Sequence, residues 1–472
     1  MKFKRLAAVI CSLCTLTSSF VYAREYSEEY WILDQMAQYV SELYLDETLT
    51  KEEAMKLAIS GLLAEDEETM VKALKSMLSG LDPYSEYLTS DEFQSFNNDL
   101  NHAFYGIGVI IQKVDNYVQI MGFTDSSPSE AAGVMPGDKI SKVDGEDMKG
   151  KSLDQVREKI LGELDTYVEV TFLRENSEYT AKIKRSEVRG DTVFYEELKG
   201  KIGYITIADM SINTHTEFAS KLEEMRKSGI TKFILDLRNN GGGYVSSAVE
   251  IANMIVPQGK VIDAYFRGQE QPVTYYSELK EKEFDIAVLV NENTASAAEI
   301  LASAIQESGV GKLYGVRTFG KGVIQQAFPL LNGSVMKITT GKYVTRAGNE
   351  IQGIGIEPDE YIKNYTEPIN TKEYEQFDYK TKWMEGLEGA GIKAAKERLY
   401  LLRYYTGETE NGQFTSELAE AITAFQADNE LYPYGVLDIT TQVKIENAFA
   451  KLQVLHDKQF DNAYAAMGGI IE

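Results

Sequence analysis

The 472-residue sequence predicts a multidomain α+β protein. Apolar residues recur three and four positions apart between residues 26 and 100, a spacing typical of amphipathic helices. Short β-rich runs follow over residues 102–186. From residue 200 onward, short apolar runs are each followed by a turn and a helical stretch, the order that places parallel strands in one sheet. We therefore expect an N-terminal helical segment, a β-rich domain, an α/β core with parallel strands and a small C-terminal helical domain.

The N-terminal segment has the features of a targeting signal. Three basic residues precede an apolar run, and Val21 and Ala23 occupy the positions that a signal peptidase recognises. We interpret residues 1–23 as a signal peptide, which predicts a secreted or extracytoplasmic protein of the bacterial cell envelope. The alternative is an uncleaved N-terminal anchor, although the apolar run is shorter than the ~20 residues that a membrane span needs.

The composition excludes several kinds of chemistry. Both cysteines, Cys11 and Cys14, fall inside the predicted signal, so the remaining chain has no disulfide, thiolate metal ligand or cysteine nucleophile. The net charge of -25 includes three positive charges in that segment, so the rest of the chain carries about -28. Such a chain repels polyanions, and we expect no nucleic-acid partner.

Residues 24–101 combine helical patterns with no catalytic residue types. The pattern ends at "LDPYSEYL", where Pro83 interrupts it. We interpret this region as one for packing or dimerisation and therefore expect a homodimer. Alternatively, these helices only cover the domain that follows.

The β-rich residues 102–186 resemble a PDZ domain. The stretch "SPSEAAGVMPGDKISKVDG" is typical of bacterial PDZ domains, and an earlier loop is placed like their carboxylate-binding loop. Glycines let successive backbone N–H groups turn towards one anion, and an open strand edge accepts a peptide by β-addition. The resemblance therefore implies that the ligand is a protein C-terminus. The expected peptide-binding loop comprises Tyr105, Gly106, Ile107 and Gly108.

Residues 187–365 form the predicted α/β core. The buried-strand runs "KFILDLR" and "DIAVLV" are each followed by a loop, "NNGGG" and "NENTAS" respectively, and then by a helical stretch. Binding and catalytic sites in open α/β sheets form outside the carboxyl ends of the strands. These two loops are therefore the candidate site.

Ser296 lies in the second of these loops and has two interpretations. With Glu299 it forms S-x-x-E, the capping box that satisfies free N–H groups at the start of a helix. A nucleophilic serine has similar needs, because a sharp strand-to-helix turn exposes its hydroxyl and the Ala297 N–H can face an oxyanion. The local sequence leaves both interpretations open.

The three histidines, His102, His215 and His456, do not adjoin these loops in the sequence. A Ser-His-Asp triad can assemble from distant residues, but we interpret each histidine as a surface or packing residue. We therefore expect a hydrolase with this sequence to use a lysine as its base.

Four motifs resemble, in this order, those of the carboxyl-terminal processing (tail-specific) serine peptidases, over about residues 26–365. They are "LDLRNNGGG", "NENTASAAEI", "RTFGKGVIQ" and "GIGIEPD". The resemblance implies that Ser296 is the nucleophile, Lys321 the general base and Gln325 the residue that orients the lysine. We expect no metal or cofactor, since cysteine is absent from the predicted mature chain and the histidines are scattered. The expected oxyanion-hole donors are the backbone N–H groups of Gly241, Gly242 and Ala297.

A lysine base needs a lowered pKa. The ordinary value of about 10.4 must fall by about 3 units, or ~4 kcal/mol, for the amine to accept a proton near neutral pH. Burial in a closed cleft has this effect. Gly320 and Gly322, together with Phe319 and Val323, predict a tight apolar seat for Lys321.

The C-terminal part follows a polar linker at residues 366–385. Residues 386–455 resemble the three-helix peptidoglycan-binding module of bacterial cell-wall proteins, and residues 456–472 are a predicted tail. Ile392-Lys393 replaces the usual Asp-Val, and a helical bundle that serves only dimer contacts is the alternative. The matching residues are Gly412, Phe414, Phe425, Gln426, Gly435, Asp438 and Thr441.

Together these features predict a secreted serine endopeptidase with a Ser-Lys dyad, gated by PDZ recognition of a substrate's C-terminal tail, with peptidoglycan as a second partner. A non-catalytic wall-associated scaffold is the alternative, disfavoured because Ser296, Lys321 and Gln325 occur together. A P-loop nucleotidase is a weaker option, since Gly322 stands where a phosphate loop needs Ser or Thr.

Overall fold

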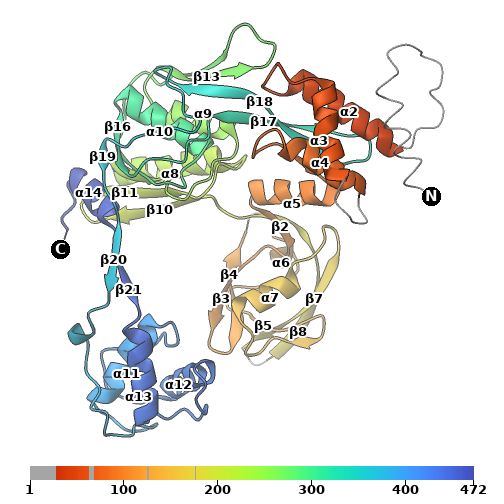
Figure 1. Cartoon of the computed structure of the whole chain (residues 1–472). Helices are drawn as coiled ribbons and strands as arrows, with labels where there is room; N and C mark the ends of the chain where they lie inside the picture. Colours follow the sequence, from red (N-terminus) through yellow and green to blue (C-terminus); the bar gives the residue numbers. More distant parts are fainter. Residues whose placement is uncertain (1–27, 63–68, 125–126, 176, 472) are drawn as a thin grey trace. The chain divides into compact units, whose positions relative to one another are not determined.

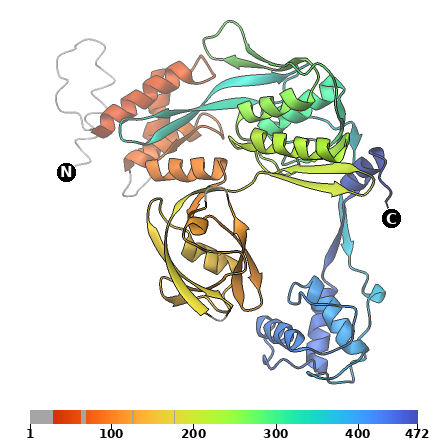
Figure 2. The same ribbon diagram turned by 180° about the vertical axis from the view of Figure 1, so that it is seen from behind.

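The computed structural model describes residues 28–62, 69–124, 127–175 and 177–471. The predicted signal peptide lies outside the described residues. The chain divides into two compact units, residues 1–361 with 463–472 and residues 362–462, and each is described by itself (Figures 1 and 2).

The N-terminal helices are present as predicted and pack on a strand of the core. Their apolar faces bury Met36, Val40 and Met77 against Met336 and Ile338 of β18. The stretch "LDPYSEYL" also contains a short strand, β1, that the sequence analysis did not predict and that pairs with β18. The N-terminal region is thereby joined to a core sheet. The elements are α2 (Glu28–Leu43), α3 (Lys51–Leu62), α4 (Thr69–Ser79), β1 (Glu86–Leu88), α5 (Ser90–Leu100) and β18 (Val335–Thr345).

The β-rich segment folds around its own apolar core, which includes Val118, Ile140, Val156 and Phe172. Its sheet has the strand order β3-β4-β5-β7-β8, and β6 pairs with β5, so β3 lies at an edge of the sheet. A separate ribbon, β2 with β9, connects this segment to its neighbours. The elements are β2 (Ala103–Gly106), β3 (Val109–Val114), β4 (Tyr117–Phe123), α6 (Pro128–Ala131), β5 (Lys139–Val143), β6 (Glu146–Asp147), α7 (Leu153–Ile160), β7 (Tyr167–Arg174), β8 (Ser177–Lys184) and β9 (Ser186–Arg189).

The α/β core confirms the predicted parallel pairing. Strands β11, β12, β15, β16 and β19 are parallel, and β10 joins the edge of this sheet antiparallel to β11. The elements of this layer are β10 (Val193–Leu198), β11 (Ile202–Ile207), α8 (Thr214–Ser228), β12 (Lys232–Asp236), α9 (Val245–Ile255), β15 (Asp285–Val290), α10 (Ala297–Ser308), β16 (Gly311–Gly315) and β19 (Glu360–Tyr361).

A second, antiparallel sheet faces helix α10 from the other side. It contains β1, β18, β13 and β14, and β17 also pairs with β18. Helix α10 contacts β16 of the parallel sheet and both β13 and β18 of this one, so its N-terminus lies between the two layers. The added strands are β13 (Gly259–Phe266), β14 (Val273–Ser277) and β17 (Val323–Pro329).

The second unit contains the three predicted helices. Phe414, Phe425 and Gln426 are buried in it, and Asp438 accepts the Thr441 N–H at the start of α13. The matching motif residues therefore build this fold. Strand β20 crosses the predicted boundary between the core and the linker, because it starts at Tyr365, and it pairs with β21. The elements are β20 (Tyr365–Pro368), a 3-10 helix at Thr371–Glu373, α11 (Ala390–Leu401), α12 (Ser416–Asp428), α13 (Ile439–Phe449) and β21 (Gln453–His456).

The segment predicted as a tail has secondary structure of its own. It includes helix α14 (Lys458–Ala466), and residues 463–472 belong to the first unit. There the Tyr464 hydroxyl donates to the Lys199 carbonyl at 2.9 Å. Within the described ranges, no helix has the length and apolar character required to cross a membrane.

Candidate active site

Ser296 lies at a sharp turn between strand β15 and helix α10. It is the residue immediately before the helix, and its φ of 55° and ψ of -118° are unusual for a residue with a side chain. Such backbone strain is typical of functional positions. Ser296 is 9% exposed, and helix α10 behind it is buried. The strand-to-helix turn that the sequence predicted is confirmed.

The Glu299 carboxylate connects the serine turn to the lysine loop. Its Oε2 atom accepts the Ser296 N–H at 2.9 Å and the Lys321 N–H at 2.8 Å. Its Oε1 atom accepts the Gly320 N–H at 2.8 Å and the Thr318 hydroxyl at 2.5 Å. Glu299 is therefore more than the helix cap that the S-x-x-E pattern indicates, because it fixes two segments to each other.

The Glu299 side chain is fully buried. Burial raises its pKa above the ordinary value, while the hydrogen bonds from Thr318, Lys321, Ser296 and Gly320 act in the opposite direction. An ionised Glu299 suits this environment, since all four of these groups donate.

Tyr343 of β18 supports the same two segments from the second sheet. Its hydroxyl lies 3.0 Å from the Ser296 carbonyl oxygen and within hydrogen-bonding distance of the Lys321 carbonyl oxygen. Burial raises the pKa of Tyr343 well above its ordinary value, so it stays a neutral donor. Glu299 and Tyr343 thus contact the same pair of residues through the backbone.

Lys321 lies in a turn that only glycine neighbours permit. A Cβ atom on Gly320, whose φ is +90°, would lie 2.8 Å from the Gly355 nitrogen, and one on Gly322 would lie 2.7 Å from the Gln352 nitrogen. Strand β17 starts immediately afterwards, at Val323. A phosphate loop would instead enter a helix, so the structure agrees with the rejection of that option.

The Lys321 side chain is largely shielded from solvent. Burial lowers its pKa below the ordinary value and the Lys337 ammonium lowers it further, whereas the carboxylates of Asp82, Glu86 and Glu299 oppose this. Its Nζ atom lies 4.7 Å from the centroid of the Tyr84 ring.

The expected apolar seat is wrong in one respect, because Phe319 is 55% exposed. Its backbone N–H bonds to the Thr294 carbonyl, which leaves the side chain on the surface. Tyr84, from the N-terminal region, takes its place beside Lys321. The sequence did not indicate that Tyr84 lies here, because Tyr84 and Lys321 are far apart in the chain and belong to different predicted domains.

The side chains of the predicted dyad do not form a hydrogen bond with each other in this conformation. Among the residues that the structure describes, no hydrogen bond joins Ser296 to Lys321 or Lys321 to Gln325. The Gln325 amide instead donates to the Thr339 hydroxyl at 3.1 Å. What the fold brings together is the backbone of Ser296 and Lys321.

The glycine loop after β12 lies against Ser296. A Cβ atom on Gly242, whose φ is +97°, would lie 2.8 Å from the Ser296 Cβ atom and 2.9 Å from the Ala297 nitrogen. The Gly242 N–H donates to the Asn240 side chain at 2.9 Å. In the described part of the chain, the N–H groups of Gly241 and Ala297 have no hydrogen-bond acceptor.

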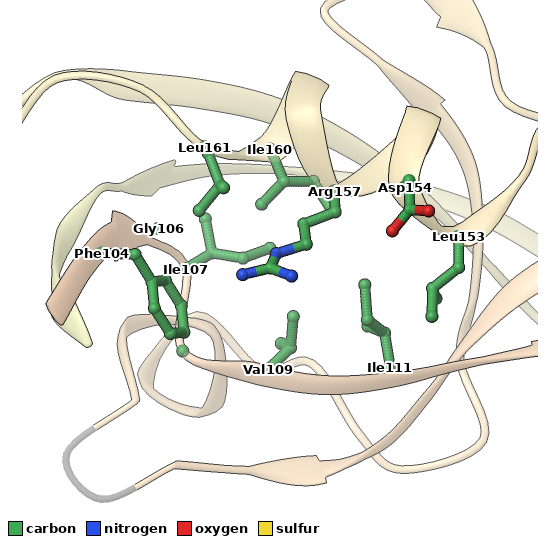
Figure 3. Close-up of a pocket in the computed structure, with 11 residues that line it drawn as sticks. Phe104, Gly106, Ile107, Val109, Ile111, Leu153, Asp154, Arg157, Ile160 and Leu161 are labelled. Atoms are coloured by element: carbon green, nitrogen blue, oxygen red, sulfur yellow. The ribbon is translucent and has the colours of Figure 1, made fainter. Parts of the chain in front are cut away.

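A second candidate site lies on the β-rich segment, between strand β3 and helix α7 (Figure 3). Gly106, Ile107 and Gly108 line it as expected, whereas Tyr105 does not and donates its hydroxyl to Asn98 of α5. The remaining lining residues are Phe104, Val109, Ile111, Leu153, Asp154, Arg157, Ile160 and Leu161.

Arg157 is the basic residue among the lining residues that the sequence analysis did not predict. Figure 3 shows it reaching from α7 across the groove, and its guanidinium lies 5.8 Å from the centroid of the Phe104 ring. Its helical spacing from Leu153 and Ile160 places all three on one face of α7, and this spacing was available in the sequence.

Histidine takes no part in the core site. His102 bonds to Asp209 at 2.7 Å, His456 bonds to Glu367, and His215 lies beside the Thr216 hydroxyl. A strained serine at a helix start, a glycine loop beside it and a partly buried lysine in the adjoining turn are compatible with a serine-type hydrolase.

Comparison with known proteins identifies the family. Residues 201–362 match the model of Peptidase family S41, and residues 388–445 match that of a putative peptidoglycan binding domain. A probable CtpA-like serine protease of Staphylococcus aureus (strain bovine RF122 / ET3-1) is 36% identical over 398 residues, which cover 83% of this chain and 77% of that protein. The chain belongs to peptidase family S41 and is a serine-type peptidase.

Two further similarities were found. A probable CtpA-like serine protease of Staphylococcus epidermidis (strain ATCC 12228 / FDA PCI 1200) is 35% identical over 426 residues, covering 88% of this chain and 84% of that protein. Among solved structures, the photosystem II D1 C-terminal processing protease is 27% identical, with a TM-score of 0.46 and coverage of 72% of this chain and 94% of that chain.

Proposed function

We propose that this peptidase is an endopeptidase outside the cytoplasm that cleaves proteins with exposed C-terminal tails, using Ser296 as nucleophile and Lys321 as base. The observation that supports this best is the Glu299 carboxylate, which bonds to the backbone N–H groups of both residues. A merely structural serine cap would not need its carboxylate partner to organise a lysine loop as well.

In the proposed reaction, neutral Lys321 takes the Ser296 hydroxyl proton as Oγ bonds to the scissile carbonyl carbon. The carbonyl oxygen becomes an oxyanion near the N–H groups of Gly241 and Ala297. Gly242 lets this loop approach Ser296 closely. Its own N–H can also donate to the oxyanion once its hydrogen bond to Asn240 is broken. The ammonium of Lys321 then protonates the leaving amine, and the C–N bond breaks to leave an acyl ester on Ser296.

Deacylation repeats these steps with water as the nucleophile. Lys321 accepts a water proton while the hydroxide oxygen bonds to the ester carbon, and it returns that proton to the Ser296 oxygen as the ester breaks. The lysine must be neutral at both stages, which agrees with the direction of its pKa shift. Gln325 is proposed to orient the amine once Lys321 turns from Tyr84 towards Ser296.

The dyad is tested by cleavage of casein and of a short fluorogenic peptide. Ser296→Ala and Lys321→Ala are each expected to lower kcat by about 10³-fold or more, since triad-type residues act as a unit. Lys312→Ala is the matched control, because Lys312 is exposed on β16. Activity close to wild type in either site variant would exclude the dyad.

We also propose that residues 102–186 act as a PDZ domain whose groove binds the tail. An unpaired β3 edge, the turn at Gly108 with φ of +71° and the apolar lining support it. Tail binding is proposed to gate the core site. A tailed substrate should outcompete the same peptide with an amidated C-terminus, whereas equal cleavage of the two would count against tail recognition.

The flanking parts have proposed roles of their own. We propose that residues 24–101 support a homodimer, which light scattering of the full chain can test. The second unit is proposed to bind peptidoglycan, which a sedimentation assay with purified sacculi can test. Secretion follows from the predicted signal peptide and is tested by fractionation of cells.

A further inference from the structure

Tyr84, in the loop between α4 and β1, contacts the Lys321 ammonium with its ring. Its ring centroid is 4.7 Å from Nζ, within the range of a cation–π interaction. Across the described ranges, Nζ has no hydrogen bond or ion pair. A cation that leaves water needs compensation, and here the face of an aromatic ring supplies it.

The Tyr84 loop is held by a carboxylate. Asp82 Oδ1 accepts the N–H groups of Tyr84 at 2.7 Å and Ser85 at 2.9 Å, and its Oδ2 accepts the Ser85 hydroxyl at 2.8 Å. This is an Asx-type turn, in which an aspartate side chain fixes the backbone that follows it. The ring is therefore presented by a stiff loop.

The same loop is hydrogen-bonded to β18, the strand whose Tyr343 contacts the backbone of Ser296 and Lys321. Buried Ser85 accepts the Thr339 N–H of β18 at 3.0 Å, and the Thr339 hydroxyl accepts the Gln325 amide at 3.1 Å. Strand β1, which starts at Glu86, continues the contact by pairing with β18. Ser85, the residue after Tyr84, and Gln325 thus both bond to Thr339.

We propose that Tyr84 is a positioning residue that holds the Lys321 ammonium between proton transfers, so that the N-terminal region completes the active site. This inference rests on the proposed role of Lys321 as the base. It also explains why "LDPYSEYL" forms a strand of the core sheet instead of a simple covering loop.

The physical role follows from the charge cycle. Lys321 becomes a cation after it takes the serine proton, and the ring face stabilises that cation while burial destabilises it. The groups that face Lys321 are Lys337 of β18, Glu86 of β1, Glu299 of α10 and Asp82 of the same loop. None of these is changed when Tyr84 is replaced, so a Tyr84 variant isolates the ring.

The test compares Tyr84→Leu with Tyr84→Phe in the full chain. kcat/KM for a short peptide is measured against pH, together with the rate of Ser296 modification by a fluorophosphonate, which needs no tail binding. The acid limb of this pH profile, where activity rises as Lys321 loses its proton, reports the pKa of Lys321. Loss of the ring in Tyr84→Leu removes a contact that favours the cation, so this limb should move to lower pH by about 0.5–1 unit. Tyr84→Phe keeps the ring face and should restore the wild-type limb.

A third variant is expected to shift the acid limb in the opposite direction. Tyr84→Ala admits water to Nζ, which weakens the burial effect, and its acid limb should move to higher pH. Tyr276→Leu is the control, because Tyr276 is an exposed tyrosine of β14. Thermal unfolding of each variant shows whether the fold is intact.

Coinciding acid limbs for Tyr84→Leu, Tyr84→Phe and wild type would overturn the inference. If Lys321→Ala is inactive while these limbs coincide, the inference fails but the dyad stands. If Lys321→Ala remains active, the proposed function itself fails. Acid limbs that separate as expected support both.

Discussion

The core site and the groove of the β-rich segment are built in opposite ways. The core site joins distant parts of the chain, as the contact between Ser85 and Thr339 shows, since these residues are 254 positions apart. The groove uses residues from Phe104 to Leu161, which come from β2, β3, the turn between these strands, and α7 with the residue that follows it. Changes in the core site should therefore affect stability and all substrates, whereas changes in the groove should affect only substrates with a tail.

The largest expected effect is that of Glu299→Gln. A glutamine offers one acceptor oxygen and a donor NH₂ to four groups that all donate. We expect kcat for short and tailed substrates to fall about 10²–10³-fold, and the melting temperature to fall with it. Glu292→Gln, in the exposed part of the same loop, is the control. A loss confined to tailed substrates would contradict this account.

Gly242→Ala should come next. The added methyl group would lie 2.7 Å from the Ala295 carbonyl oxygen, at a φ of +97° that favours glycine. The expected cost in unfolding free energy is about 1–3 kcal/mol, measured by thermal or urea unfolding. Gly241→Ala meets no atom within 4 Å and serves as the matched control for stability. Equal stability of the two variants would show that the loop rearranges to accommodate the methyl group, which would contradict this prediction.

Arg157→Gln tests the groove. Removing the guanidinium from the groove should raise KM for a tailed substrate by about 5–10-fold, the size of a single charge-assisted contact. Cleavage of a short peptide should not change. Lys159→Gln on the same helix is the control, since Lys159 is exposed and pairs with Glu146. Loss of activity on both substrates would place Arg157 in the fold rather than in recognition.

Lys321→Met should give the smallest effect, with the opposite sign. The pKa of Lys321 is lowered by folding, so the unfolded chain binds the proton more tightly and stability rises with pH up to the unfolded value of about 10.4. Replacing the lysine by an apolar side chain should raise unfolding free energy by about 1 kcal/mol at pH 7. Urea unfolding should show this gain shrinking towards pH 10. A constant gain would argue against the buried charge as its cause.

Some of the site was predictable because it depends on local geometry. The strand, turn and helix around Ser296 and the turn around Lys321 follow from apolar runs, a capping pattern and paired glycines, and the structure has each of them. The role of Gln325 stays a prediction, because its amide bonds to Thr339 in this conformation. The orientation of a long side chain is not encoded by the spacing of its neighbours.

Other parts were not predictable because they depend on pairing between distant strands. Phe319 was expected beside Lys321 as a sequence neighbour, yet it faces solvent, and Tyr84 occupies that place. The three-residue strand β1 is too short to show a periodic pattern. Its pairing with β18 is specified by the surfaces that meet in the folded state.

The sequence alone therefore indicated which residues could do chemistry: both cysteines lie within the first 23 residues, no histidine adjoins the loops in the sequence, and the resemblance of four motifs to a serine peptidase family implies roles for Ser296 and Lys321. Only the tertiary structure decided which groups surround them. Glu299 gained a second role, Tyr343 and Tyr84 entered the site, and the Gly242 N–H found a partner in Asn240. Composition and spacing act along the chain, whereas burial and hydrogen bonding act between segments that only folding brings into contact.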